Sequence, residues 1–205
     1  MIRYNPHIKR GLDILLSSAA LLFLSPLLMI LCTLICLESE GDPFFFQRRI
    51  GKKWLPFRLI KFRSMRPDKA ALSRQFEPGE KCRVTRFGEF LRKTKLDELP
   101  ELFNVLFGDM SIVGPRPEVE KYFSVYPDEF RVILEVRPGL SDFASIKYRN
   151  EEEILASVAD PEHYYVAGIL PDKLKLAAEY VERISLRTDM KIISETLRSL
   201  LHPER

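Results

Sequence analysis

The feature that most restricts the fold of this chain is an uncharged apolar run near its beginning. The twenty-four residues from Ile14 to Leu37 include no Asp, Glu, Lys or Arg. About 20 apolar residues are enough for a helix to cross a bilayer. A cleavable signal peptide fits poorly, because the run is too long and no small-residue cleavage site follows it. The sequence therefore predicts a membrane segment that stays in the mature protein.

Basic residues lie on both sides of the apolar run. Residues 1–66 contain eleven Lys and Arg against four Asp and Glu, whereas residues 67–205 contain twenty-one against twenty-five. Anionic lipid head groups and nucleic acid both attract such a patch, and the adjoining apolar run favours lipid over nucleic acid. Because positive charge marks the cytoplasmic side, two basic flanks favour a segment that enters and leaves through the same face.

Ser25-Pro26 supplies a bend in the middle of the run. Proline has no N–H and crowds the carbonyl of Leu22, which the Ser25 hydroxyl can satisfy. These features alone fit a re-entrant helix-break-helix and an ordinary spanning helix with a proline kink equally well.

Carboxylates and basic side chains must carry any chemistry in this chain. The three cysteines, Cys32, Cys36 and Cys82, match neither a disulfide framework nor a zinc knuckle. Only three histidines occur, and two of them are near the termini. A histidine triad or a histidine-ligated metal would therefore have to rest on the third, His163.

The remaining pattern predicts an α+β fold that is mostly helical, with few short strands. We expect extended segments at Asp42–Gln47 and Trp54–Phe62 around a turn at Gly51, and an exposed loop over 67–82. Apolar spacing predicts helices over Phe87–Phe107, Pro171–Ile184 and Ser185–Leu201. The domain division is a membrane element over 1–40 and a compact catalytic domain over 41–205.

Two of these helices carry specific expectations. Pro100 interrupts the first, so a new helix should begin near Asp97, with its carboxylate close to exposed N–H groups. The last helix has an amphipathic pattern, and either packing on the domain or lying on the membrane explains it. Its predicted apolar face consists of Leu186, Met190, Ile193, Leu197 and Leu200.

Asp97-Glu98 is the first candidate site, because it lies among Arg86, Arg92, Lys93 and Lys95. A site for phosphate and a divalent metal needs carboxylates for the metal and cations for the phosphate. Adjacent helical residues point about 100° apart, so the two carboxylates should address different sides of the site. A solvated acidic pair at a helix start is the alternative.

Arg116 is the second candidate, because Pro115 and Pro117 fix it on both sides. A rigid guanidinium suits bidentate phosphate recognition, and the alternative is a structural turn with an outward arginine. Val136-Arg137-Pro138-Gly139 repeats the arrangement more weakly.

Together these segments resemble, in order and spacing, the small monotopic bacterial polyprenyl-phosphate phosphoglycosyl transferases. The resemblance covers residues 9–140, and linked motifs are more specific than any single one. The matching segments are Lys9-Arg10, Ser25-Pro26, Phe45–Gly51, Lys61–Met65, Arg83–Gly88, Leu91–Pro100 and Gly108–Pro117.

The resemblance implies a re-entrant helix in the bacterial inner membrane and a catalytic domain with amphipathic interfacial helices on the cytoplasmic face. It implies Mg²⁺ held by Asp97 and Glu98, a UDP-sugar donor, a polyprenyl phosphate acceptor, and ping-pong transfer through a covalent Asp97 intermediate. The product would pass to downstream glycosyltransferases, and self-association is left open. The implied phosphate and substrate contacts are Arg92, Arg116, Lys61, Arg63, Arg137 and Pro115.

The chain departs from the family pattern after Gly139. It reads Leu140–Ser145 as LSDFAS, where many relatives have a threonine-glycine-tryptophan-alanine-glutamine run. The sugar pocket, and hence the sugar, is therefore not identified. The chain also lacks the extra N-terminal membrane helices of larger relatives, so it is similar to their catalytic core.

Three other classes fit the sequence less well. A multi-spanning polyprenyl sugar-phosphate transferase is excluded because only one long apolar segment is present. A phosphotransferase acting on CDP-activated alcohols needs several spanning helices, and only one long apolar segment is present. A membrane-tethered scaffold explains the apolar run and the basic flanks. It does not explain Asp97-Glu98 and Arg116 in a shared basic setting.

Overall fold

The computed structural model describes residues 5–66 and 83–201, so the loop predicted over 67–82 and Cys82 lie outside the described residues. As predicted, the described chain is mostly helical, with two small two-stranded sheets. Its helices are α1 Pro6–Glu38, α2 Arg86–Thr94, α3 Glu101–Phe107, α4 Pro127–Ile133, α5 Phe143–Lys147, α6 Glu151–Ala156, α7 Pro161–Tyr164, α8 Leu170–Glu182 and α9 Leu186–Leu201. The strands are β1 Phe44–Ile50, β2 Pro56–Phe62, β3 Ser111–Val113 and β4 Gly139–Ser141. Short turns complete the fold: the 3₁₀ turns η1 Lys52–Trp54, η4 Leu96–Glu98 and η5 Glu120–Tyr122, and the π-helical turn η6 Tyr165–Ile169.

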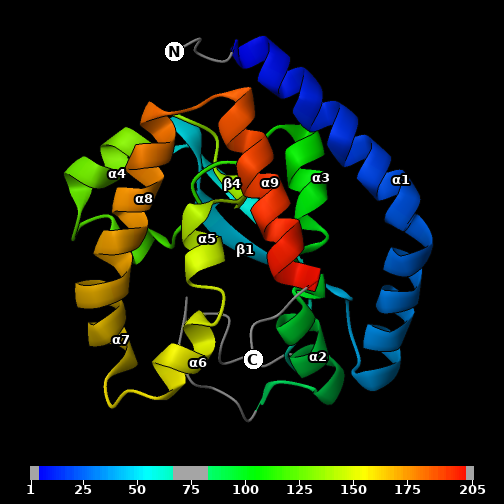
Figure 1. Cartoon of the computed structure of the whole chain (residues 1–205). Helices are drawn as coiled ribbons and strands as arrows, with labels where there is room; N and C mark the ends of the chain where they lie inside the picture. The colour runs from blue at the N-terminus through cyan, green and yellow to red at the C-terminus, as the bar shows by residue number, and fades with distance from the viewer. Residues whose placement is uncertain (1–4, 67–82, 202–205) are drawn as a thin grey trace.

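Helix α1 follows one side of the molecule and changes direction along its length (Figure 1). It is the one helix among the described residues that is long and apolar enough for a membrane. Its Pro26 lies inside a continuous helix, and the Ser25 hydroxyl donates to the Leu22 carbonyl at 2.8 Å, as predicted. The expected break thus takes the form of a proline within an unbroken helix, and re-entrance stays a prediction.

Both ends of α1 are tied to the rest of the molecule by polar contacts. Near its start, Lys9 forms an ion pair with Asp189 of α9 at 2.6 Å. At its end, the Glu38 carboxylate accepts from the Phe87 N–H at 3.0 Å. The middle of the helix is exposed, with Phe23 84% accessible. The division into units 1–40 and 41–205 stays a prediction.

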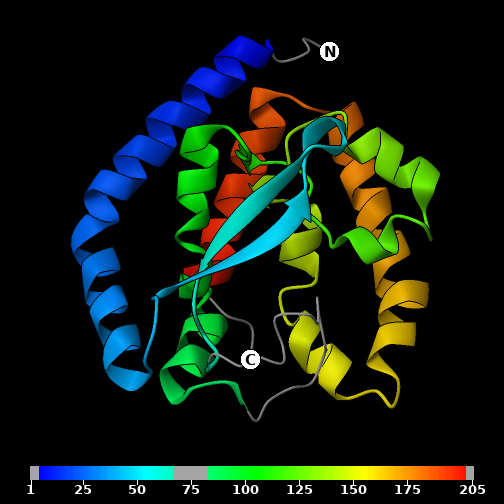
Figure 2. The same ribbon diagram turned by 180° about the vertical axis from the view of Figure 1, so that it is seen from behind.

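Strands β1 and β2 form an antiparallel hairpin in which Phe44 is opposite Phe62 and Ile50 is opposite Pro56. The hairpin crosses the molecule from the α1 and α2 side towards α4 (Figure 2). The predicted turn at Gly51 is present, but the left-handed residues are Lys53 and Trp54 rather than the glycine. The Lys53 N–H donates to the Leu134 carbonyl at 2.7 Å, which fixes the tip beside α4.

The largest apolar core lies between α4, α8, η5 and η6. Most of its buried side chains are aliphatic, with aromatic ones such as Phe130 among them, and full burial of a Leu, Ile or Phe side chain contributes about 1.5–3 kcal/mol. A second core joins α1 to the hairpin and α2, through Leu31, Ile35, Phe62 and Leu91. Helix α1 is therefore part of the packing that supports the middle of the chain.

The last two helices begin and end within two residues of their predicted bounds. The predicted apolar face of α9 is divided: Ile193 packs against the core, whereas Leu186, Met190 and Leu197 are 51–55% exposed. Among the side chains of α9 that the structure describes, Asp189 and Ile192 are buried. Asp189 faces inward because it is paired with Lys9 and accepts from the Tyr180 hydroxyl at 2.9 Å. A hydrophobic pattern does not register such polar pairing, so it did not identify Asp189 as a buried position.

Candidate active site

Asp97 and Glu98 lie in η4, the tight turn that joins α2 to α3. Pro100 has no N–H to offer the Leu96 carbonyl, so the Leu99 N–H donates to it at 3.2 Å and the turn takes 3₁₀ form. Lys95, in the left-handed region, separates this turn from α2. A helical turn therefore begins at Leu96, near Asp97 as predicted, but it is a 3₁₀ turn and the α-helix α3 begins only at Glu101.

Apolar side chains on both sides of the pair hold the turn in place. Leu96 and Leu99 pack against the core that contains Leu31, Ile35 and Phe62. One apolar cluster thus includes side chains of α1 and the residues next to the predicted dyad.

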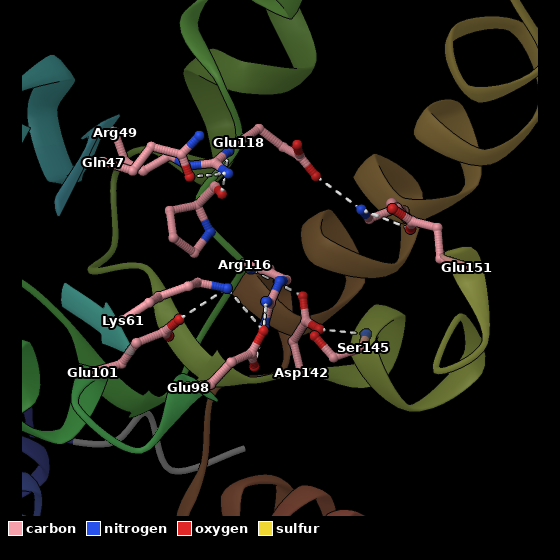
Figure 3. A network of polar contacts seen from close by, with 12 residues as sticks. Gln47, Arg49, Lys61, Glu98, Glu101, Arg116, Glu118, Asp142, Ser145 and Glu151 are labelled. Carbon is pink, nitrogen blue, oxygen red and sulfur yellow. Dashed lines mark hydrogen bonds and ion pairs between the residues drawn. The ribbon is translucent and has the colours of Figure 1, made fainter. Parts of the chain in front are cut away.

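Glu98 is held by two cations from other elements (Figure 3). The two terminal nitrogens of Arg116 contact its two oxygens, and Lys61 Nζ of β2 lies 2.9 Å from Oε1. Burial alone would raise the pKa of Glu98, but the Arg116 and Lys61 charges outweigh it and hold this pKa well below its usual range. Glu98 therefore stays ionised and aligns both cations.

Asp97 has different surroundings, although it is the adjacent residue. Only 8% of it is exposed, and burial raises its pKa to about 6 against the opposing pull of the Lys61 charge. Its Oδ1 is buried and has no hydrogen-bond partner among the described residues. A buried carboxylate oxygen without a partner is an available nucleophile or metal ligand.

Glu101 is a third carboxylate of this site, which the sequence analysis did not single out. It is 1% exposed, and its Oε1 lies 3.4 Å from Lys61 Nζ, opposite Glu98. Burial raises its pKa to about 7. Its spacing, one helical turn after Asp97, is the signal that could have identified it.

A close contact between two glycines brings Arg116 to this site. A Cβ on Gly139 would lie 2.0 Å from the Gly114 nitrogen, so neither position accepts a side chain without backbone movement. Gly139 N–H donates to the carbonyl of Pro115 at 2.9 Å. The Arg116 N–H donates to Asp142 Oδ2 at 3.0 Å, which fixes the backbone of the arginine.

Asp142 is a further residue that sequence reasoning missed, within the segment that departs from the family pattern. It is 2% exposed, and its Oδ1 also accepts from the Ser145 N–H at 2.6 Å, which starts α5. Its position directly before a helix was the available signal.

Two of the other arginines predicted to bind phosphate donate hydrogen bonds to backbone carbonyls. The Arg63 guanidinium donates to the carbonyls of Ser39 at 2.7 Å and Glu40 at 2.9 Å, and Arg137 Nε donates to the Gly108 carbonyl at 2.8 Å. Arg92 is close enough to Asp97 for its charge to oppose the burial that raises the pKa of Asp97. The phosphate-binding roles of these three arginines stay predictions.

A second polar network lies beside the first (Figure 3). Arg49 of β1 donates to Gln47 Oε1 at 2.8 Å and to the Pro117 carbonyl at 3.3 Å. Lys173 of α8 pairs with Glu118 at 2.9 Å, and with Arg49 it holds the pKa of that carboxyl below its usual range despite burial. This network fixes the chain immediately after Arg116.

The donor set allows a test of the predicted magnesium site. Within residues 5–66 and 83–201, no three His, Cys, Asp or Glu side chains converge as a metal cluster. Both oxygens of Glu98 are already in contact with cations. The free Oδ1 of Asp97 fits Mg²⁺, which commonly takes one or two protein carboxylates together with substrate phosphates.

Comparisons with known proteins agree with the sequence motifs. Residues 4–203 match the family model described as bacterial sugar transferase. The chain is 37% identical, over 95% of its length, to a UDP-N-acetylgalactosamine-undecaprenyl-phosphate N-acetylgalactosaminephosphotransferase of Aeromonas hydrophila, and it covers 44% of that protein. It is 33% identical to the exopolysaccharide production protein ExoY of Sinorhizobium fredii, with 92% of this chain and 83% of that protein covered.

A third relative acts on a different sugar. The chain is 34% identical to a UDP-glucose:undecaprenyl-phosphate glucose-1-phosphate transferase of Caulobacter vibrioides, over 94% of its own length and 69% of the relative. The chain thus spans less than half of the Aeromonas protein and most of the other two. The names of the Aeromonas and Caulobacter relatives give different sugars.

Proposed function

The chain belongs to the bacterial sugar transferase family, and from this we propose that it transfers a sugar 1-phosphate from a UDP-sugar to polyprenyl phosphate. The products are a polyprenyl diphosphate sugar and UMP. The family's relatives named for undecaprenyl-phosphate transfer support the reaction class. The observation that carries the assignment to a site is the buried, unpartnered Oδ1 of Asp97 between cations.

The proposed reaction has two displacements at one phosphorus. A carboxylate oxygen of Asp97 attacks the sugar-bearing β-phosphorus of the donor, the bond to the bridging oxygen breaks, and UMP leaves with that electron pair. An oxygen of polyprenyl phosphate then attacks the same phosphorus and displaces Asp97. A carboxylate nucleophile in this way divides one displacement into two.

The residues around Asp97 have separate tasks in this proposal. Arg116 and Lys61 offset negative charge on the donor phosphates, and Glu98 keeps both cations aligned by accepting from them. Arg92 adds positive charge beside the nucleophile. Bound magnesium, held by Asp97 with Glu98 beside it, would supply further charge neutralisation for phosphoryl transfer.

We further propose that α1 is re-entrant in the bacterial inner membrane and that the catalytic domain lies on the cytoplasmic face. The polar ties at both ends of α1 support this topology: Lys9 contacts α9, and the end of α1 contacts Arg63 and Phe87. A straight helix of 33 residues would be about 50 Å long. A helix that crosses the bilayer would place one end on the side opposite the domain.

The product suits a lipid-linked assembly pathway. A polyprenyl diphosphate sugar is the acceptor that later glycosyltransferases would extend. Relatives named for exopolysaccharide production support a role at the first membrane step of glycoconjugate synthesis.

The experiment measures UMP release by the detergent-solubilised protein from a panel of UDP-sugars, with magnesium and undecaprenyl phosphate. Asp97→Asn should abolish turnover, whereas Asp128→Asn, an exposed carboxylate of α4 paired only weakly with Arg131, should keep it. With a donor labelled in the β-phosphate and no acceptor, the label should remain on the wild-type chain and not on Asp97→Asn. Turnover without any labelled protein would exclude the covalent route, and no UMP from any donor would favour a non-enzymatic scaffold.

A further inference from the structure

Asp13 is a buried carboxylate that the proposed mechanism does not use. It is the fourth residue after Lys9 on α1 and directly precedes the apolar run, and it is 4% exposed. Its Oδ1 accepts two hydrogen bonds at 3.0 Å, one from the Ser111 hydroxyl and one from the Ile112 N–H. Both donors belong to β3, ninety-eight and ninety-nine residues away along the chain.

The topology of β3 explains why this contact matters. β3 pairs with β4 through Ser111 and Val113, so Ile112 directs its N–H to the opposite edge of a two-stranded sheet. An unpaired edge N–H in the interior is costly, and here a side chain takes the place of a third strand. Asp13 therefore fixes β3 from the side that no strand covers.

Other residues at the start of α1 reinforce this arrangement. Arg10 donates to the carbonyls of Val105 at 2.6 Å and Leu106 at 2.8 Å, at the end of α3. The hydroxyl of Tyr180 lies 3.0 Å from the Val113 carbonyl and 2.9 Å from Asp189, the partner of Lys9. The first turns of α1 thus contact the segments on both sides of β3.

Strand β3 leads directly to the cation that holds Glu98. Gly114 and Pro115 separate Val113 from Arg116, and the glycine is pressed against the backbone of Gly139. Pro115 has a fixed φ and so transmits displacement instead of absorbing it. A shift of β3 would therefore move the Arg116 guanidinium relative to Glu98.

We propose that Asp13 is a positioning residue that sets the placement of Arg116 through β3. The packing of α1 against β3 would then control how the Arg116 guanidinium is aligned with Glu98. This inference rests on the proposed function for its kinetic consequence. Its structural consequence is independent of that function. A misplacement of about 1 Å at such a site can cost roughly 100-fold in rate.

The test compares three substitutions on α1 in the full-length, detergent-solubilised protein. Asp13→Ala removes the acceptor, whereas Asp13→Asn keeps an Oδ1 that can accept from both donors. Ser17→Ala is the matched control, because Ser17 lies one turn later, is 0% exposed, and donates only to the Ile14 carbonyl of its own helix. UMP release gives kcat and KM for the donor, and amide hydrogen exchange reports protection over residues 111–116.

The expected result is a fall in kcat/KM of roughly 10- to 100-fold for Asp13→Ala, and values near wild type for Asp13→Asn and Ser17→Ala. Exchange over 111–116 should be faster in Asp13→Ala alone. Equal exchange in Asp13→Ala and Ser17→Ala would overturn the inference, even if no donor is turned over. If wild type releases no UMP, the proposed function fails and exchange alone decides the inference.

Two further variants protect the test from a simple folding defect. Ser111→Ala can be used if Asp13→Ala cannot be purified. It removes one of the two donors to Asp13 and should give a smaller loss of kcat/KM than the loss expected for Asp13→Ala. A wild-type kcat/KM would count against the inference. In an Arg116→Lys background, Asp13→Ala should cost less than it does in wild type. If the fold-losses of kcat/KM from the two single variants multiply in full in the double variant, Asp13 does not act through Arg116.

Discussion

At Asp97 and Glu98, adjacent carboxylates have pKa values shifted in opposite directions. Burial dominates at Asp97, whereas the Arg116 and Lys61 charges dominate at Glu98. The sequence predicts the pair and its basic setting. It does not predict the difference, because Lys61 is 37 residues and Arg116 is 18 residues from Glu98.

Glu101 gives a prediction for stability against pH. Its pKa is raised from 4.5 to about 7, so the folded protein holds this proton more tightly than the unfolded chain. The stabilisation is fully present below about pH 4.5 and is lost as the pH rises through about 7. Glutamine does not ionise, so Glu101→Gln removes this loss of stability at high pH. At pH 8 the free energy of unfolding of the variant should exceed that of wild type by on the order of 1–3 kcal/mol.

Thermal unfolding in detergent at pH 5 and pH 8 measures this effect. Wild type should unfold at a lower temperature at pH 8, and the difference should shrink in Glu101→Gln. The exposed Glu129→Gln on α4 is the control and should behave as wild type does. An unchanged difference in Glu101→Gln would show that burial of Glu101 does not set the pH response.

At the scale of elements, local chemistry was predictable where it depended on near neighbours. The contact between Ser25 and the Leu22 carbonyl follows from the proline after it, and it is present. The hairpin, α8 and α9 follow from apolar spacing. The 3₁₀ form of the turn before α3 was not predicted. Nor was the burial of Asp189 in α9, because its partner Lys9 is distant along the chain.

Pro26 gives a prediction for the path of α1. Pro26→Ala restores an N–H for the Leu22 carbonyl and removes the ring that crowds it, so α1 should straighten and favour crossing the bilayer. A cysteine introduced at Asn5 in a cysteine-free background reports the side of the membrane, by labelling intact cells with an impermeant maleimide. Wild type should remain unlabelled, and a fraction of Pro26→Ala should react.

Ser18→Ala, an exposed position in the same apolar run, is the matched control and should remain unlabelled. Equal labelling of Pro26→Ala and wild type would mean that the polar ties at the ends of α1 set the topology without the proline.

At the scale of the whole molecule, the sequence predicted a membrane part and a catalytic part but not the contacts between them. Asp13, Arg10 and Glu38 join segments that no local pattern relates. The same holds for the exposed face of α9, where Leu186, Met190 and Leu197 form one stripe away from the core. The sequence left two explanations open for this face, and packing on the domain accounts for only about half of each of these three side chains.

We predict that this stripe of α9 lies on the membrane. Burial in lipid would stabilise each side chain by about 1.5–3 kcal/mol. A tryptophan placed at Met190, with Trp54→Phe to remove the native one, should be quenched by brominated lipid in vesicles. A tryptophan at Lys191, about 100° around the helix, should be quenched less, and equal quenching at the two positions would contradict the prediction.

The packing of α1 has a practical consequence for anyone who wants this enzyme in water. Deleting residues 1–40 would uncover Phe62 and Leu91 and leave the Ile112 N–H without its acceptor. A truncated fragment would therefore be expected to precipitate instead of dissolving. A soluble form is better sought by keeping the helix and replacing its outward side chains with polar ones, at positions such as Leu22, Phe23 and Met29.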